Sequence, residues 1–238
     1  MIASPRIVLP ELLDELEPND PRARRSRRDL RYVHRAMRSL SILQRAIARL
    51  RLAAPPKRIL ELGAGDASLM LRLAQAQRDW GGVALTILDR HDLLSKETRD
   101  AYQQLGWDLT VVRANVIEWA KEVHAQHFDL CVTTLFLHHF DRAALSTLMA
   151  AIAAESAAFV ACEPRRNAVS WLASQFVGIL GANAVTRHDA VTSVGAGFVD
   201  RELMESWPKP HADWCCEEYA APPFTHCFAA VRKSVRRG

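Results

Sequence analysis

A short apolar segment that ends in a glycine-rich turn constrains this chain more than any other feature. It reads Ile59-Leu60-Glu61-Leu62-Gly63-Ala64-Gly65-Asp66-Ala67, and a helical pattern follows it. Gly63 and Gly65 carry no Cβ, so the backbone can come very close to a bound nucleoside. The pattern therefore predicts a strand, a tight turn and a helix around a nucleotide-type ligand.

The details of this turn disfavour a dinucleotide. The dinucleotide pattern has a third glycine where this chain has Ser68. Asp66 and Glu61 place negative charge where a pyrophosphate would lie, and like charges repel. A cationic or neutral nucleoside avoids that repulsion. S-adenosylmethionine, a sulfonium that also carries an ammonium group, fits this electrostatic description.

From residue 55 onward, short apolar segments alternate with helical patterns. Such alternation is typical of an α/β fold with a doubly wound, mostly parallel sheet. The last two predicted strands are joined by Ala220-Ala221-Pro222-Pro223, a connection short enough for an antiparallel pair. The predicted strands are 58–62, 84–88, 109–112, 128–133, 159–162, 214–219 and 225–231, and the predicted helices between them are 67–77, 95–105, 117–123, 142–154 and 171–180.

The N-terminal part has a different pattern. Residues 7–17 predict a short amphipathic helix, and residues 21–52 predict a long arginine-rich helix with one apolar face. Pro55 and Pro56 then mark a boundary. We expect residues 1–54 to form a helical cap or lid and residues 55–238 to form the main domain.

Positive charge is concentrated in that first part. The formal net charge is +4, and eight arginines crowd one stretch: Arg22, Arg24, Arg25, Arg27, Arg28, Arg31, Arg35 and Arg38. A solvated helix face, anionic lipid, an acidic substrate and nucleic acid are the alternatives. Tyr32 is the only aromatic residue among these arginines, so no base-stacking platform is indicated and we expect no nucleic-acid partner.

Cysteine usage and hydropathy indicate the compartment. The five cysteines are scattered, without the spacing of a zinc site or a disulfide framework, so we predict no metal. No apolar run is long enough to span a bilayer, and the start lacks a secretion-signal pattern. These features favour the cytoplasm.

Four segments at predicted strand ends resemble the class I S-adenosylmethionine-dependent methyltransferases, over roughly residues 55–232. The segments are Glu61-Leu62-Gly63-Ala64-Gly65, Asp89 after Thr86-Ile87-Leu88, Arg113-Ala114-Asn115-Val116, and Phe128 to Thr134. The resemblance implies a Rossmann-like, seven-stranded sheet with an antiparallel C-terminal strand, plus the N-terminal helical cap. Ala67 stands where the family has a third loop glycine, and Asn115 stands where it usually has an aspartate.

The resemblance also implies which residues bind the cofactor. Asp89 would hold the ribose hydroxyls, Arg90 would flank the adenine, and Asn115 would accept a hydrogen bond from the adenine amine. Residues after the fourth strand would lie over the methionine part. The implied cofactor-binding set is Glu61, Gly63, Ala64, Gly65, Asp89, Arg90, Asn115, Val116 and Thr134.

Three histidines are candidates for the catalytic base. His138 and His139 follow the fourth predicted strand, at the sheet edge where ligands bind. Either could remove a proton or orient the acceptor, or it could pack against the next helix. His188 and Asp189 could form a base and its orienting partner, or belong to a capped helix start. We expect Asp141 to be a helix N-cap.

The residues around these candidates indicate the substrate class. Arg165 and Arg166 either meet an anionic substrate or lie in a solvated loop. Trp171 and Phe176 suggest an enclosed, partly apolar pocket. We expect O-methylation of a hydroxylated aromatic or polyketide-like small molecule, in secondary metabolism. The alternatives are C-methylation of a quinone-type precursor and a non-catalytic nucleotide-binding partner subunit. A homodimer and peripheral contact between anionic lipid and the arginines are further expectations.

Overall fold

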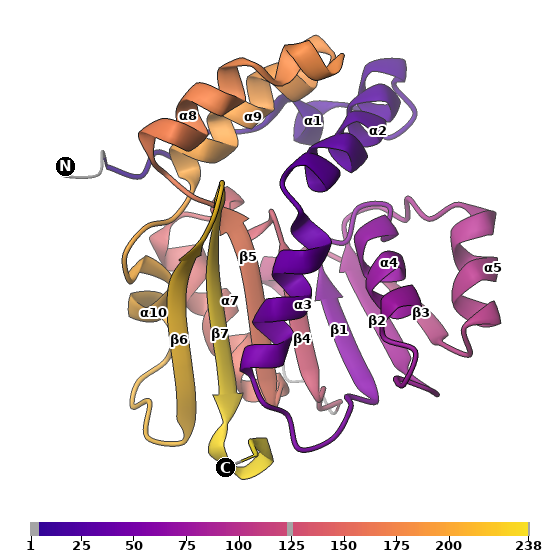
Figure 1. Cartoon of the computed structure of the whole chain (residues 1–238), viewed down its shortest axis with the longest axis vertical. Helices are drawn as coiled ribbons and strands as arrows, with labels where there is room; N and C mark the ends of the chain where they lie inside the picture. The colour runs from indigo at the N-terminus through magenta and orange to yellow at the C-terminus, as the bar shows by residue number, and fades with distance from the viewer. Residues whose placement is uncertain (1–4, 123–125, 238) are drawn as a thin grey trace.

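A seven-stranded sheet in the order β3-β2-β1-β4-β5-β7-β6 forms the centre of the protein (Figure 1). This computed structural model describes residues 5–122 and 126–237. The strands are β1 (Arg58–Leu62), β2 (Ala84–Asp89), β3 (Asp108–Arg113), β4 (Leu130–Thr134), β5 (Ala158–Pro164), β6 (Trp214–Ala221) and β7 (Thr225–Arg232). The first five are parallel, and β7 is antiparallel to both β5 and β6. The predicted doubly wound sheet and its antiparallel C-terminal pair are confirmed.

Helices cover both faces of the sheet, and alternate strand residues form two cores. In β5 all seven residues are buried, as expected of a central strand covered on both sides. Val160 and Cys162 belong to one core, whereas Phe159 and Ala161 belong to the other. The first core includes residues of α3 (Ser39–Arg49), α4 (Ser68–Ala76) and α5 (Lys96–Gln104), and the second those of α6 (Val116–Trp119), α7 (Arg142–Glu155) and α10 (Glu202–Ser206).

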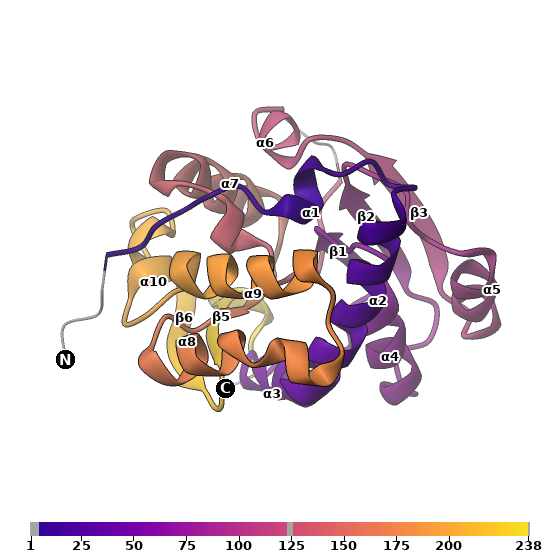
Figure 2. The same cartoon turned by 90° about the horizontal axis from the view of Figure 1, so that it is seen from above.

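The remaining helices form a layer above the carboxyl ends of the parallel strands (Figures 1 and 2). They are α1 (Leu12–Glu15), α2 (Pro21–Ala36), α8 (Ala168–Gln175), η2 (Val177–Leu180) and α9 (Ala184–Ala196), while η1 (Leu137–His139) lies below them and η3 (Lys233–Val235) near the C-terminus. Helix α9 contacts α1, α2 and α8. We name α1, α2, α8, η2 and α9 the cap layer. It combines N-terminal helices with an insertion between β5 and β6.

The N-terminal segment differs from its prediction in two ways. The expected single helix over residues 21–52 is two helices, because Arg38 adopts a left-handed conformation (φ 57°) between α2 and α3. Only α2 joins the cap layer, whereas α3 contacts β5 and β7. Its residues Ile42, Leu43, Ala46, Ile47 and Leu50 belong to the first core. Thus the predicted cap of residues 1–54 contributes a helix to the α/β body as well.

Other boundaries differ by smaller amounts. In residues 7–17 only Leu12–Glu15 is helical, and the helix expected over 117–123 is Val116–Trp119. The predicted end of that helix at Val123 lies outside the described residues. Residues 1–4 of the predicted N-terminal cap lie outside them as well. Among the helices that the structure describes, none is both long and apolar enough to cross a bilayer.

The turn after β1 yields a matched pair of variants. Gly63 and Gly65 both have positive φ (66° and 57°), but a Cβ on Gly63 would collide with the Phe136 ring, whereas a Cβ on Gly65 meets nothing within 4 Å. We expect Gly65→Ala to lower the free energy of unfolding by about 1 kcal/mol, from backbone strain alone. Gly63→Ala should cost about 2–4 kcal/mol, since overpacking adds to that strain.

Urea unfolding of the two variants and the wild type measures this difference. Equal losses of stability in Gly63→Ala and Gly65→Ala would show that Phe136 yields to the added methyl group.

Candidate active site

A cavity of about 1050 Å³ lies between the carboxyl ends of the strands and the cap layer. Residues of the turn after β1, the ends of β2 and β4, and the residues after β3 line one part. Residues of helices α1, α2, α8 and α9 line the other walls. Since β1 lies between β2 and β4 in the sheet, the chain reverses direction across the sheet at this point. Ligands bind at such switch points in open α/β sheets.

Backbone bonds fix the glycine-rich turn. The Gly63 N–H donates to the Leu88 carbonyl at 3.0 Å, and the Gly65 N–H donates to Asp89 Oδ2 at 3.0 Å. Ala67, at the place of the family's third glycine, adopts a left-handed conformation (φ 54°). Asp66 accepts from the Ser68 N–H and forms an ion pair with Arg31 of α2 at 2.6 Å. The turn is therefore tied both to β2 and to the cap layer.

Glu61 is a buried carboxyl group for which the described part of the chain supplies no ion-pair partner. It is 4% exposed and lines the cavity, and Oε2 has no hydrogen-bond partner among the described residues. Burial, together with the charges of Asp89 and Asp66, raises its pKa to about 8. Ionised Glu61 is costly unless a donor or a cation is near. A ligand with an ammonium or sulfonium charge would supply one, so the donor set fits S-adenosylmethionine.

The structure brings the whole predicted cofactor-binding set to the cavity wall. The set is Glu61, Gly63, Ala64, Gly65, Asp89, Arg90, Asn115, Val116 and Thr134. Asp89 accepts from two backbone N–H groups, those of Gly65 and His91, each at 3.0 Å. The Asn115 side-chain oxygen caps α6 by accepting from the Ile117 N–H at 2.9 Å. Asn115 therefore has a structural task besides the predicted one.

His138 lies between two carboxylates. Its Nδ1 is 2.8 Å from Glu163 Oε2, and its Nε2 is 3.3 Å from Glu11 Oε1. Burial alone would lower the pKa of His138, but the hydrogen bonds and charges of Glu11 and Glu163 outweigh burial and raise it to about 9. At neutral pH the ring is a cation with both nitrogens occupied. It therefore lacks the free lone pair that a base or a metal ligand needs.

Glu163 organises the residues after β4. It is completely buried and accepts hydrogen bonds from the backbone N–H groups of Phe136, Leu137 and His138 at 3.0–3.3 Å. Sequence reasoning treated the segment after β5 as a turn with two arginines that could meet a substrate. Arg166 instead pairs with Glu202 at 2.6 Å, and neither Arg165 nor Arg166 lines the cavity.

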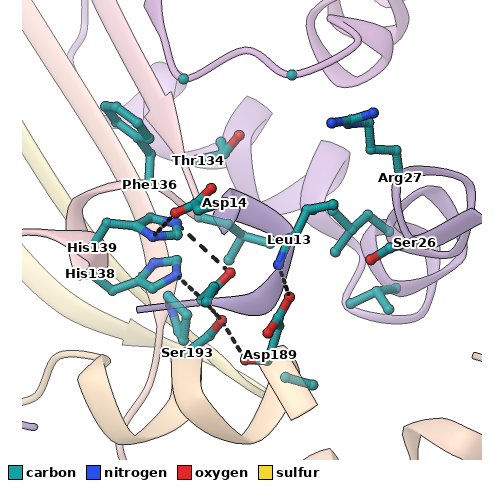
Figure 3. A pocket seen from close by; sticks show the side chains of 18 of the residues that line it. Leu13, Asp14, Ser26, Arg27, Thr134, Phe136, His138, His139, Asp189 and Ser193 are labelled. Atoms are coloured by element: carbon teal, nitrogen blue, oxygen red, sulfur yellow. Dashed lines mark hydrogen bonds and ion pairs between the residues drawn. The ribbon is translucent and has the colours of Figure 1, made fainter. Parts of the chain in front are cut away.

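His138 and His139 both line the cavity, and His139 is the more exposed of the two. Its side chain is 21% exposed, and its Nδ1 is 3.2 Å from Asp14 Oδ2 (Figure 3). Its Nε2 lies 4.0 Å from Glu11 Oε2, outside hydrogen-bond distance. A carboxylate on Nδ1 directs the lone pair of a neutral imidazole to Nε2, which is the arrangement of a general base.

Residues 5–14, which we name the strap, supply both of these acidic partners. Asp189 accepts from the backbone N–H groups of Leu12 and Leu13 at 2.8 and 3.0 Å, and Ser193 donates to Glu11. For Glu11 and Asp14, burial would raise the pKa, but the facing histidines hold it below the ordinary value. Sequence reasoning missed Glu11, Asp14 and Glu163, and no local pattern marks them because their partners are remote in the chain.

His188 does not join this cluster. Its side chain is half exposed on α9 and does not line the cavity, although its Nδ1 lies 3.1 Å from Asp189. The carboxylate of Asp189 instead holds the strap. The polar segment begins a helix that is capped by Asn183, which is the alternative that the sequence left open. Asp141 caps α7, as predicted.

Oxygen and nitrogen atoms of Glu11, His138 and His139 lie within 4.8 Å of one another. Such a cluster of donors can hold a metal ion. Here the hydrogen bonds already described engage His138 on both sides, and its proton occupies the ligating position. We therefore interpret the cluster as an ionic latch between the strap and the sheet.

The latch yields a prediction on pH. Since the pKa of His138 is raised from 6.5 to about 9, its contribution to stability is fully present below pH 6.5 and is lost as the pH rises through about 9. At 1.36 kcal/mol per pKa unit this contribution is about 3 kcal/mol. We expect His138→Gln to lower the urea midpoint strongly at pH 6.5 and only weakly above pH 9.

The control is His188→Gln, which alters a half-exposed histidine of the cap layer. Its urea midpoint should follow that of the wild type across this pH range. A constant deficit of His138→Gln at all pH values would mean that packing rather than charge explains its effect.

Comparison with known proteins supports these geometric conclusions. Residues 59–155 match a sequence model described as "Methyltransferase domain". Among curated proteins, no match was found. Among solved structures, the plantazolicin methyltransferase BpumL in complex with SAH is 12% identical, with a TM-score of 0.63 over 90% of this chain and 92% of that one.

Two further structures are similar in fold. The pyocyanin biosynthetic protein PhzM is 20% identical, with a TM-score of 0.54 over 90% of this chain and 59% of that one. The magnesium protoporphyrin IX methyltransferase ChlM of Synechocystis PCC 6803, with bound SAH, is 14% identical, with a TM-score of 0.52 over 87% of this chain and 86% of that one. Residues 59–155 are thus a methyltransferase domain, and the chain has the fold of small-molecule S-adenosylmethionine-dependent methyltransferases.

Proposed function

We propose that this protein transfers a methyl group from S-adenosylmethionine to a hydroxyl oxygen of a hydroxylated aromatic or polyketide-like small molecule. The buried carboxyl group of Glu61 carries the donor side of this proposal, because it faces the cavity with one oxygen unpartnered. Asp66 and Asp89 add to the negative charge around the turn. Together they favour a cationic nucleoside and disfavour a phosphate.

Asp89 has the capacity to hold a ribose. Each of its carboxylate oxygens accepts one backbone hydrogen bond, and each retains acceptor capacity for a hydroxyl group. These two bonds also fix the carboxylate with respect to the glycine turn. The side chain is thus oriented before the cofactor binds, which reduces the entropy lost on binding.

The acceptor side depends on His139. Bound S-adenosylmethionine supplies an electrophilic methyl group on a sulfonium. An acceptor oxygen that received this methyl group would lose its proton, and His139, which lines the cavity, is the group that would take it through Nε2. Asp14 holds Nδ1 and stabilises the imidazolium that results.

The cavity walls agree with an acceptor that is largely apolar. Leu30 and Val33 of α2 line it, together with Met37 just after that helix and Phe136 and Phe140 near η1. Such a wall removes water from the reacting atoms and positions a ring or chain for in-line transfer. A structure of similar fold is described as a putative O-methyltransferase of Nostoc punctiforme (12% identical, TM-score 0.55).

Carbon methylation of a quinone-type precursor is the alternative chemistry, since it also needs an acceptor that loses a proton. A non-catalytic nucleotide-binding subunit is the alternative without chemistry. A cytoplasmic role in secondary metabolism and a homodimer stay part of the proposal. The reducing compartment is supported by the five cysteines, none of which forms a disulfide.

The cofactor assignment predicts the effect of removing one carboxylate. We expect Asp89→Ala to weaken the binding of S-adenosylmethionine and its demethylated product by about 1–3 kcal/mol, because two hydrogen bonds to the ribose are lost. Isothermal titration calorimetry with each compound measures this change. The matched control is Asp92→Ala, which alters an aspartate that pairs with Arg99 and does not line the cavity.

Affinity in Asp92→Ala should equal that of the wild type. If Asp89→Ala binds as tightly as the wild type, Asp89 does not hold the ribose. If the wild type binds neither compound, both the cofactor and the enzymatic function are excluded.

The acceptor chemistry predicts the products and the effect of the base. With methyl-labelled cofactor and a panel of phenols and hydroxylated polyketide-like compounds, we expect O-methyl products. His139→Gln should lower kcat by about 10²–10⁴, the usual contribution of a general base. Asp14→Asn should lower it less, and should shift the pH profile of kcat, since the histidine loses its charged partner.

Mass spectrometry and chromatography of the labelled products measure this outcome, and cofactor affinity measured by calorimetry should be unchanged in both variants. His188→Gln serves as the control, with kcat equal to that of the wild type. Exclusive formation of carbon-methylated products would favour the quinone-type alternative, and full activity in His139→Gln would exclude the assigned base.

A further inference from the structure

The segment of α8 and η2 exposes an unusual amount of apolar surface. Five large apolar side chains in residues 169–179 are more than half exposed: Val169 (62%), Trp171 (53%), Leu172 (55%), Phe176 (55%) and Ile179 (79%). They make up half of the exposed large apolar side chains in the described part of the chain. We name them the apolar patch. So many exposed large apolar side chains within eleven residues indicate a surface that contacts something else.

An arginine-rich helix borders this patch. Helix α2 carries seven arginines and a single aspartate, Asp29. The Arg25 guanidinium donates to the Gly181 carbonyl at 3.3 Å, and Asp29 accepts from the Asn183 N–H at 2.8 Å, which places α2 beside the end of η2. Figures 1 and 2 show both elements in the cap layer. Within residues 5–122 and 126–237, two of the α2 arginines form an ion pair with an acidic side chain: Arg22 pairs with Asp20 and Arg31 pairs with Asp66.

The combination of the two surfaces identifies the chemistry of the partner. Exposed tryptophan and phenylalanine beside unneutralised arginines match the interfacial region of a bilayer, where apolar side chains insert and cations meet lipid phosphates. If α2 of one copy met α2 of a second copy, the arginines of the two helices would repel each other. The charge therefore favours an anionic lipid surface over self-association.

The patch is continuous with the acceptor cavity. Phe176 and Ile179 are exposed on the surface and also line the cavity, and the neighbouring Ala173 and Val177 line it too. The wall that separates the cavity from the surface is thus built from the same apolar segment. A molecule dissolved in a membrane could pass from the bilayer to the cavity without crossing water.

We propose that the apolar patch and the arginines of α2 bind an anionic phospholipid membrane, from which the methyl acceptor enters the cavity. The acceptor is then an apolar, membrane-soluble compound with a hydroxyl group. The second part of this inference rests on the proposed methyl transfer, whereas the binding of lipid does not.

Vesicle sedimentation tests the membrane contact. The wild type should bind vesicles of phosphatidylcholine and phosphatidylglycerol, and binding should weaken as salt is added, because salt screens the arginines. It should bind vesicles of phosphatidylcholine alone much less. Trp171→Ser/Leu172→Ser and Arg24→Gln/Arg28→Gln should each reduce the vesicle partition coefficient by about tenfold or more.

Matched controls alter the same residue types elsewhere. Leu105→Ser removes an exposed leucine of α5's C-terminal end, and Arg78→Gln removes an exposed arginine after α4. Both should bind vesicles as the wild type does. Quenching by bromine-labelled lipid should be observed for the wild type and should decrease in Trp171→Phe, which locates the contact.

A methylation assay separates the two parts of the inference. Trp171 and Leu172 do not line the cavity, so Trp171→Ser/Leu172→Ser should keep its activity on a water-soluble phenol and lose activity on a long-chain phenol embedded in vesicles. If the wild type methylates neither compound but still binds vesicles, the proposed methyl transfer is overturned and the membrane contact is retained.

Three outcomes would overturn the membrane proposal. These are equal binding to vesicles with and without anionic lipid, unchanged binding by the patch and arginine variants, and a concentration-dependent dimer in light scattering that Trp171→Ser/Leu172→Ser abolishes. The last result would assign the patch to a second copy of the chain.

Discussion

The ionised contact of His138 with Glu163 and Glu11 joins three separate parts of this protein. Glu163 ends a central strand, His138 belongs to the turn after β4, and Glu11 comes from the N-terminal strap. A buried charge is costly alone, so each of these groups depends on the others. The cap layer above the cavity is therefore coupled to the sheet by charge as well as by apolar packing.

This latch explains the different positions of two neighbouring histidines. His138 is buried with both nitrogens engaged, whereas His139 is more exposed, with Asp14 3.2 Å from Nδ1 and Glu11 at the longer distance of 4.0 Å from Nε2. Because Asp14 and Glu11 lie on the strap, the proposed base is oriented only when the strap is in place. The N-terminal segment thus belongs to the proposed active site, beyond its role as a cover.

The cavity lining includes both acidic and apolar groups. Glu61, Asp66 and Asp89 make the lining near the glycine turn acidic, which suits a cationic donor. Apolar side chains of α2, α8 and η2 line the cavity as well, beside polar ones such as Arg27 and Ser174, and Ile179 is also exposed on the surface. In the proposed function, the acidic groups serve the cationic cofactor and the apolar groups serve the acceptor.

The amino-acid sequence alone predicted the α/β sheet and the glycine turn, because apolar periodicity and the closely spaced Gly63 and Gly65 are local features, whereas Asp89 meets the Gly65 N–H across 24 positions. Only the tertiary structure separated His138 from His139, excluded His188 from the cavity wall and recruited Glu11 and Asp14. Those outcomes depend on contacts across more than a hundred residues, such as His138 with Glu11 (127 positions apart). Burial and charge pairing arise only after folding, so no spacing in the sequence encodes them.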